Sequence, residues 1–209
     1  ELPRLNVMQW RWPGWLLCAL TAGLFAWIFF VVIPPITALI DGMKLPDQVL
    51  LGYGAEDARV LFAAFKADDA AAEAQGRPSA SQAYLALHAG YDLVLPPLLA
   101  ASLAYCAFAA LEKPAQRNQI PRLAVVGFVL VLALAFAYLA SDFMENSVAD
   151  AMFGPQTLTL PFRQELVFAL QVLTRSKFAS LAGSVALTAA LWLWRWKYRR
   201  RDTRPEMET

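Results

Sequence analysis

Charged side chains recur inside or beside the apolar segments of this sequence, where carboxylates and amines could transfer protons, bind a cation or hold a polar head group. They occur in three of these segments. The first of the three contains Asp92, the next contains Asp142 and Glu145, and the last contains Arg175 and Lys177. An ionisable side chain in hydrocarbon costs on the order of 2.5–3.5 kcal/mol on insertion scales, so such residues usually pair or serve a function. The pattern identifies a candidate site without fixing its chemistry.

Helical spacing adds neighbours to this site. In each apolar segment the charged residues lie about 20 residues from the far end of that segment. At about 1.5 Å per residue, this places all of them at about the same depth in the membrane. Residues spaced i, i+3 and i+4 share a helix face, which groups the polar residues of each segment. The predicted polar site consists of Asp92, Asp142, Glu145, Asn146, Lys177, Arg175, His88 and Tyr84. The alternative interpretation is structural: the two bases neutralise the acids and fix the helix ends.

The sequence offers few other groups that could do chemistry. His88 is the only histidine, so the chain alone cannot supply bis-histidine haem ligation or a histidine-rich metal site, and a single axial ligand stays open. Three carboxylates suit a hard divalent ion, but the two bases compete for them. No nucleophile–base constellation, phosphate loop or C-x-x-C motif occurs. We assign no catalytic residue and no metal ligand, and the cofactor stays unknown, with bound lipid or quinone as candidates.

Composition and hydropathy determine the elements that must position these residues. The chain has 209 residues, of which 58% are hydrophobic and 17% charged, with a mean hydropathy of +0.43. Four apolar runs each approach the roughly 20 residues that a membrane-spanning helix needs. We predict an all-α membrane protein, an antiparallel bundle with spans at about 15–40, 82–112, 122–147 and 162–196, the last projecting above the bilayer. Proline pairs at 34–35 and 96–97 are expected to bend two of the helices.

The distribution of charge predicts the orientation of the bundle. Residues 1–14, 112–122 and 195–209 hold 11 of the 18 basic and 5 of the 17 acidic residues. That side carries a formal charge of +6 and the other side −5. The positive-inside rule places both termini in the cytoplasm, and the basic tail faces anionic lipid rather than nucleic acid. The predicted location is the bacterial cytoplasmic membrane.

The only sizeable extramembrane segment, residues 41–80, is predicted to hold an extracytoplasmic amphipathic helix. Hydrophobic residues recur there at helical spacing, and charged residues occupy the opposite face. The apolar face is expected to lie on the bilayer or to cap the bundle. We predict that Phe62 and Phe65 form a docking surface for a membrane protein partner.

One sequence pattern resembles a known group. Gly52-Tyr53 precedes a helix, Gly76-Arg77 precedes Tyr84, Asp92 and Pro96, and Asp142-x-x-Glu145-Asn146 is followed by Lys177. This order resembles uncharacterised bacterial four-helix integral membrane proteins over about residues 50–180. The resemblance implies the four-helix architecture and the choice of site residues, and it implies no activity.

Three hypotheses for function follow. The leading one is a non-catalytic accessory or assembly subunit of a larger membrane complex, because the chain is small and has no catalytic constellation. The second is a lipid- or quinone-handling protein or enzyme, with Asp142 and Glu145 as an acid/base pair and Lys177 holding an anionic head group. The third is an ion- or proton-coupled transporter, for which the remaining parts of the helices offer no evident charge pathway. Membrane lipids are expected partners under each hypothesis.

Overall fold

The structure is a computed structural model, and it describes residues 11–111 and 121–202. Within these ranges the chain forms helices, turns and loops, and no strand. Four helical stretches are long and apolar enough to cross a membrane: Trp12–Ala38, Tyr91–Ala110, Arg122–Phe153 and Gln164–Lys197. The predicted all-α fold with four spans is confirmed, and the chain is a multi-pass membrane protein.

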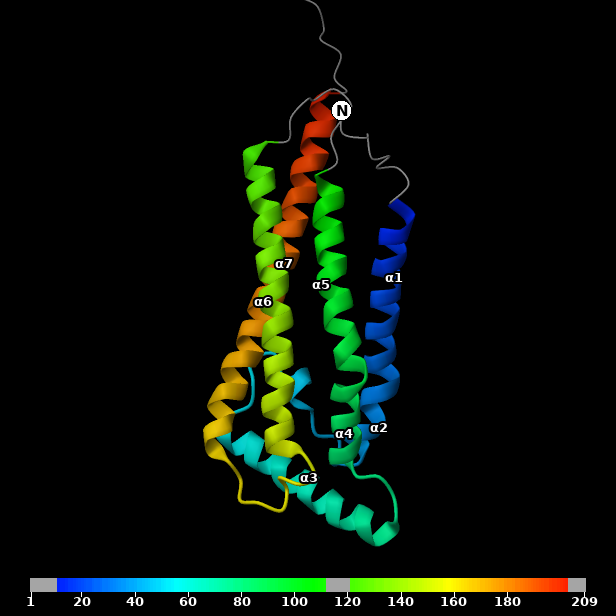
Figure 1. Cartoon of the computed structure of the whole chain (residues 1–209), viewed down its shortest axis with the longest axis vertical. Coiled ribbons are helices and arrows are strands. Elements are labelled where there is room, and N and C mark those ends of the chain that lie inside the picture. Colours follow the sequence, from blue (N-terminus) through cyan, green and yellow to red (C-terminus); the bar gives the residue numbers. More distant parts are fainter. Residues whose placement is uncertain (1–10, 112–120, 203–209) are drawn as a thin grey trace, which may run out of the picture.

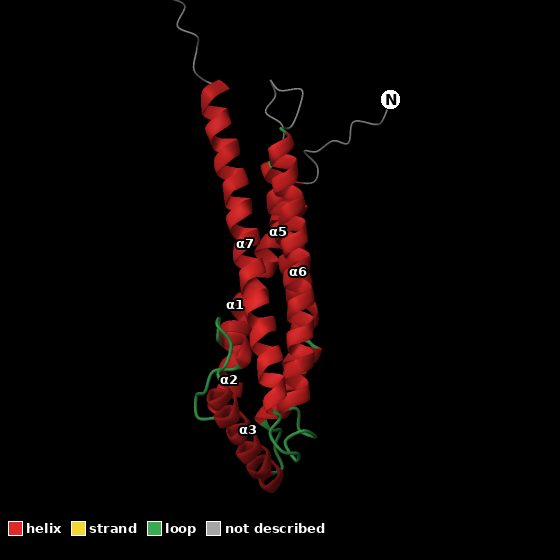
Figure 2. Cartoon of the chain, turned by 90° about the vertical axis from the view of Figure 1, so that its left-hand side faces the viewer, coloured by secondary structure: helices red, strands yellow, loops and turns green. Residues whose placement is uncertain are grey.

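The four long helices stand side by side along the long axis of the molecule (Figure 1). They are α1 (Arg11–Trp27), α5 (Tyr91–Ala110), α6 (Arg122–Phe153) and α7 (Gln164–Asp202). Helices α6 and α7 pack together extensively, α5 packs against both, and α1 packs against α5. Figure 2 shows α7 diverging from α5 and α6 toward its C-terminal end. Helix α1 begins and α7 ends at the same end of the bundle, as an even number of spans requires.

Glycines allow α6 and α7 to approach each other closely. A Cβ atom on Gly183 would lie 3.1 Å from Leu134, and one on Gly127 would lie 3.2 Å from Leu191. Without a hydrophobic driving force in lipid, helix association depends on such close packing. The same close approach lets polar side chains of α6 and α7 meet further along the pair.

Hydroxyl and thiol groups join α1 to α5. The hydroxyl oxygens of Thr21 and Ser102 are 2.9 Å apart. The sulfur atoms of Cys18 and Cys106 are 3.6 Å apart, although 88 residues separate them in the sequence. Both cysteines are free thiols, and they act here as small packing residues between two helices.

The proline pair at 34–35 adjoins irregular helix geometry, whereas Pro96 and Pro97 lie inside α5 (Tyr91–Ala110). A π-helical turn, η2 (Ile28–Val32), separates α1 from α2 (Ile33–Ala38), which carries Pro34 and Pro35 near its start. Proline has no amide hydrogen to bond the carbonyl one turn back, and π-helical turns are among the causes of helix bends. The predicted second span is also divided: α4 (Ala80–Ala89) ends at Gly90, whose φ of −114° and ψ of −83° are not helical, and α5 begins at Tyr91.

Residues between the first two spans cover one end of the bundle. A single 3-10 turn, η3 (Pro46–Gln48), is followed by α3 (Ala55–Gln75), which crosses that end obliquely (Figure 1). Phe65 is 0% exposed and Phe62 is 8% exposed. The ring of Phe65 packs against Tyr84 and Phe153, with centroids 5.8 and 5.4 Å apart. Phe62 and Phe65 therefore belong to the core, and the prediction that they form a docking surface is wrong, because the chain itself covers them.

A buried aspartate joins α3 to α4. Asp68 accepts hydrogen bonds from Arg77 at 2.5 Å and from the backbone amide of Ala80 at 2.6 Å. Gly76, with a φ of +65°, ends α3 in the left-handed conformation that glycine favours. Asp68 thus fixes the turn between two helices by bonding both the arginine after the turn and the first residue of α4.

We expect Asp68→Ala to lower the free energy of unfolding by about 1–3 kcal/mol, since it leaves a buried amide and an arginine without their acceptor. Asp69→Ala, a change at the neighbouring and more exposed position, is the matched control. Thermal or denaturant unfolding in detergent measures both variants. Equal losses in the two variants would contradict the assignment of Asp68 as the residue that fixes this turn.

Candidate functional site

Lys177 of α7 is the centre of a buried network of charged residues. Its ammonium nitrogen lies 2.7 Å from Asp142, 2.7 Å from Glu145 and 3.0 Å from Asp47. Asp142 and Glu145 face it because α6 and α7 are close antiparallel neighbours. Thr174, one turn before Lys177, donates a hydrogen bond to the other oxygen of Glu145. An ammonium group has three hydrogens, so these three carboxylates saturate it.

Asp47 reaches the network from outside the helices of the bundle. It lies in the 3-10 turn η3, where Pro46 occupies the first position and Asp47 the second. One oxygen of its carboxylate accepts a hydrogen bond from Lys177, and the other accepts one at 3.1 Å from the hydroxyl of Tyr84. Asp47 therefore joins α7 to α4 through a loop residue.

His88, near the end of α4, lies on the other side of Asp47. Its Nδ1 atom is 2.5 Å from Asp150 of α6. Its Nε2 atom lies 3.7 Å from Asp47 and 3.8 Å from Asp92, both beyond hydrogen-bond distance. The imidazole is 4% exposed, and Nε2 has no hydrogen-bond partner among the described residues.

Two groups of the network outside the membrane spans have perturbed pKa values. Burial opposes ionisation of Asp47, but the positive charges of Lys177 and His88 outweigh it and hold the pKa of Asp47 well below its usual range. Burial likewise opposes protonation of His88. The hydrogen bond to Asp150 and the nearby Asp47 carboxylate outweigh it and raise the pKa of His88 to about 10.

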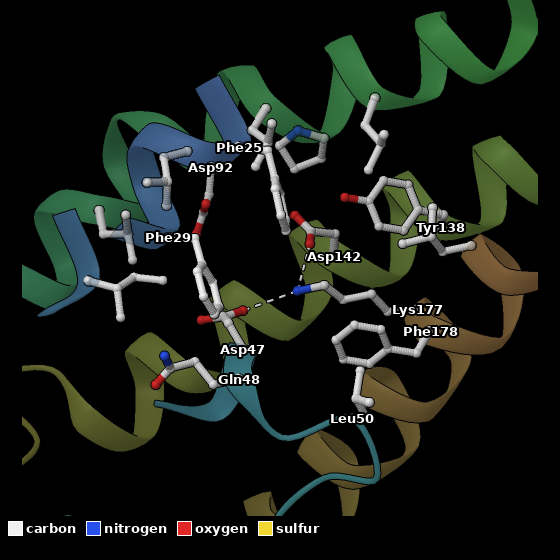
Figure 3. A pocket seen from close by; sticks show the side chains of 17 residues that line it. Phe25, Phe29, Asp47, Gln48, Leu50, Asp92, Tyr138, Asp142, Lys177 and Phe178 are labelled. Carbon is white, nitrogen blue, oxygen red and sulfur yellow. Dashed lines mark hydrogen bonds and ion pairs between the residues drawn. The ribbon is translucent and has the colours of Figure 1, made fainter. Parts of the chain in front are cut away.

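A cavity of about 360 Å³ opens beside the network (Figure 3). Apolar side chains from α1, η2, α5, α6 and α7 form most of its lining, and Asp47, Asp92, Asp142 and Lys177 stand at one end. Phe25 and Phe29 belong to the lining and are 54% and 44% exposed on the first membrane span. The cavity therefore borders the surface that faces lipid.

The structure brings six of the eight predicted site residues together: Tyr84, His88, Asp92, Asp142, Glu145 and Lys177. Arg175 does not join them. It is exposed, and its guanidinium donates a hydrogen bond to the backbone carbonyl of Leu51, because two residues along α7 turn it away from Lys177. Asn146 is buried, and its side-chain oxygen accepts no hydrogen bond from the described residues.

Two expected roles change with this geometry. The three hydrogens of Lys177 point to Asp47, Asp142 and Glu145, which argues against the expected role of Lys177 in holding an anionic head group. Glu145 is 1% exposed and does not line the cavity, which argues against its expected role as an acid or base at a substrate. The acceptors that line the cavity are Asp47, Asp92 and Asp142.

Sequence reasoning missed Asp47, Asp150 and Thr174. Asp150 could have been found, because it follows Asp142 by eight residues and Asn146 by four on the same helix face. Thr174 precedes Lys177 by three residues and could have been found in the same way. Asp47 had no comparable signal, since a loop has no periodicity that shows where its side chains point.

This arrangement has a defined chemical preference. At the polar end of the cavity there are more acceptor oxygens than free hydrogen-bond donors. One of these acceptors, Oδ2 of Asp142, is buried without a hydrogen-bond partner among the described residues. Such a site suits a group that brings N–H or O–H donors, or a cation, and it repels an anion. No protein-family model, curated protein or solved structure matches this chain, so its function is inferred from the site itself.

Proposed function

We propose that this protein binds a membrane amphiphile whose polar head carries hydrogen-bond donors, such as an ammonium or hydroxyl group. One observation carries the proposal: an apolar cavity of about 360 Å³ beside the lipid-facing surface has its polar end at Asp142, whose buried Oδ2 has no partner among the described residues. The tail of the amphiphile would occupy the apolar part and its head would bond Asp142.

Charge supports this class of ligand over the others considered. The carboxylates at the polar end disfavour an anionic head, and Lys177 has no free hydrogen to offset them. An oxidised quinone has only acceptor oxygens, so it could donate no hydrogen bond to the carboxylates. A phospholipid with a primary ammonium head, or a hydroxyl-bearing lipid, satisfies them.

The lining supports an apolar tail of moderate size. Leu95, Leu99, Phe178 and Leu181 contribute to the cavity together with the aromatic residues of α1 and η2. Ligand pockets are typically about 300–1,000 Å³ and mostly apolar, with a few placed polar groups. A cavity near the lower end of that range would enclose the head and the first part of an acyl chain, with the remainder in the bilayer.

The test compares two zwitterionic lipids, of which only one carries N–H donors on its head group. Phosphatidylethanolamine has N–H groups, whereas phosphatidylcholine has methyl groups in their place. Native mass spectrometry of the delipidated protein titrated with each lipid should show about tenfold tighter binding of phosphatidylethanolamine, since a hydrogen bond to a charged group contributes about 1.5–3 kcal/mol. Asp142→Asn should remove most of this preference.

Variants in the apolar part of the cavity supply the second measurement. Leu99→Trp, which fills the cavity, should weaken the binding of both lipids. Leu93→Trp, on the same helix but 58% exposed and outside the cavity, is the matched control and should bind as the wild type does. Equal binding of the two lipids by the wild type, or no effect of Leu99→Trp, would overturn the proposal.

We further propose that both termini lie in the cytoplasm of a bacterial cell, with α3 on the outer side of its cytoplasmic membrane. The support is the basic excess of the tails and of the loop near 113–121, together with the shared end of the bundle at which α1 begins and α7 ends.

The accessory-subunit hypothesis stays a prediction, and it has lost the docking residues on which it depended.

A further inference from the structure

We propose that Asp47, His88 and Asp92 form a binding site for one divalent transition-metal ion, with Asp150 orienting the histidine. The site uses other residues than the proposed head-group contact at Asp142 but adjoins it, since Asp47, Asp92 and Asp142 line the same cavity. It adds a function that the amphiphile proposal does not require.

The three candidate ligand atoms are arranged around a common point. A carboxylate oxygen of Asp47, Nε2 of His88 and a carboxylate oxygen of Asp92 all lie within 4.8 Å of one another. Nε2 is 3.7 Å from Asp47 and 3.8 Å from Asp92. A tetrahedral ion with ligands at about 2.1 Å separates them by about 3.4 Å. Small side-chain rotations would close the remaining difference.

His88 supplies an independent observation in favour of a ligand. The side chain is buried and Nε2, which points between the two carboxylates, has no hydrogen-bond partner among the described residues. Most buried polar atoms have a partner, so an unpartnered one needs an explanation. A metal ion between the three groups would give Nε2 its missing partner.

Asp150 holds the ring in the orientation that ligation requires. Its carboxylate lies 2.5 Å from Nδ1 of His88. Histidine ligands commonly donate their other ring N–H to a carboxylate, which fixes the tautomer and makes the free nitrogen a better ligand. The Asp150–His88 pair has this arrangement, and it directs Nε2 toward Asp47 and Asp92.

The charge of the network also favours a cation. Among the described residues, the carboxylates of Asp47, Asp92, Asp142, Glu145 and Asp150 surround two bases, His88 and Lys177. Full ionisation of these groups would give 2 − 5 = −3. Asp150 is partly exposed, but the other four carboxylates are largely buried, and a divalent ion would reduce their excess negative charge.

The ligand types narrow the choice of metal. Imidazole suits zinc, iron and copper, whereas carboxylates suit manganese and magnesium, so a mixed site with one nitrogen and two oxygens favours Zn²⁺ or Mn²⁺. Three protein ligands leave at least one coordination position for another group. Asp47 and Asp92 both line the cavity, so that position would face the bound head group.

Isothermal titration calorimetry of the chelator-treated, delipidated protein with Zn²⁺ and with Mn²⁺ tests the site. We expect one ion per chain for at least one of the two metals. Asp92→Asn and His88→Gln should each weaken binding at least tenfold. Asp150→Asn, at a partly exposed position whose change is compatible with folding, should weaken it about 10–100-fold, the usual effect of losing a histidine's orienting partner.

Glu145→Gln is the charge-matched control, because it removes one negative charge from the same network without removing a ligand. It should retain affinity within about threefold of the wild type. Binding that Asp92→Asn and Asp150→Asn leave unchanged, or that Glu145→Gln weakens as much as Asp92→Asn does, would overturn the proposal, as would the absence of one-to-one binding. Lipid preference is measured separately by mass spectrometry, so failure of the metal site and failure of amphiphile binding are distinguishable.

Discussion

Replacement of Lys177 by methionine is expected to lower the free energy of unfolding by about 3–5 kcal/mol, the range for removing one partner of a buried ion pair. Methionine keeps the length and apolar stem of lysine and removes the charge. Asp47, Asp142 and Glu145 would then stand together without the ammonium group that holds them. Reversible unfolding in mixed detergent micelles, with chelator present, measures the loss.

Arg175→Met is the matched control for Lys177. It removes a basic residue from the same helix two positions away, but the arginine is exposed and donates one hydrogen bond to a backbone carbonyl. We expect a loss within about 1 kcal/mol. A Lys177→Met variant no less stable than Arg175→Met would show that the network contributes nothing to folding.

A double variant separates charge from packing at this site. Glu145→Gln in the Lys177→Met background removes one of the carboxylates that the lysine had neutralised. If uncompensated charge causes the loss, the second change should recover part of the stability, with a coupling energy of about 0.5–3 kcal/mol. Strictly additive losses would indicate that the lysine acts through packing alone.

Phe65→Ala is expected to lower the free energy of unfolding by about 3–5 kcal/mol, as phenylalanine-to-alanine changes in a core do. The ring is fully buried between Tyr84 and Phe153, so its removal leaves a cavity under α3. Because Tyr84 also bonds Asp47, the cavity would loosen the support of the polar network. Thermal unfolding in detergent measures the loss of stability.

Val60→Ala provides the comparison on the same helix. Val60 is 45% exposed on the other face of α3, and its truncation should cost less than about 1 kcal/mol. If Phe65 served as a docking residue, the two variants would be similarly stable and only partner binding would change. A stable Phe65→Ala protein would therefore contradict the core assignment and revive the docking hypothesis.

The sequence by itself determined the elements and the depth of the site. A run of about 20 apolar residues must form a helix in lipid, because no water is available to satisfy its backbone groups, so four runs give four spans. Residues such as Asp142 and Lys177 are costly at that depth, which identified them before their partners were known. Helical spacing then grouped Asp142 with Glu145 and His88 with Asp92.

Only the tertiary structure decided which side chains meet. Asp47 lies in a loop whose direction depends on how α3 packs across the bundle, and no local pattern reports it. Arg175 and Lys177 are both basic and two residues apart, yet only the packing of α7 on α6 turns Lys177 inward. The apolar face of α3 could equally have packed against lipid, a partner protein or the core, because the hydrophobic effect depends on the apolar area buried and not on what covers it. The packing of Phe65 on Tyr84 and Phe153 selected the core.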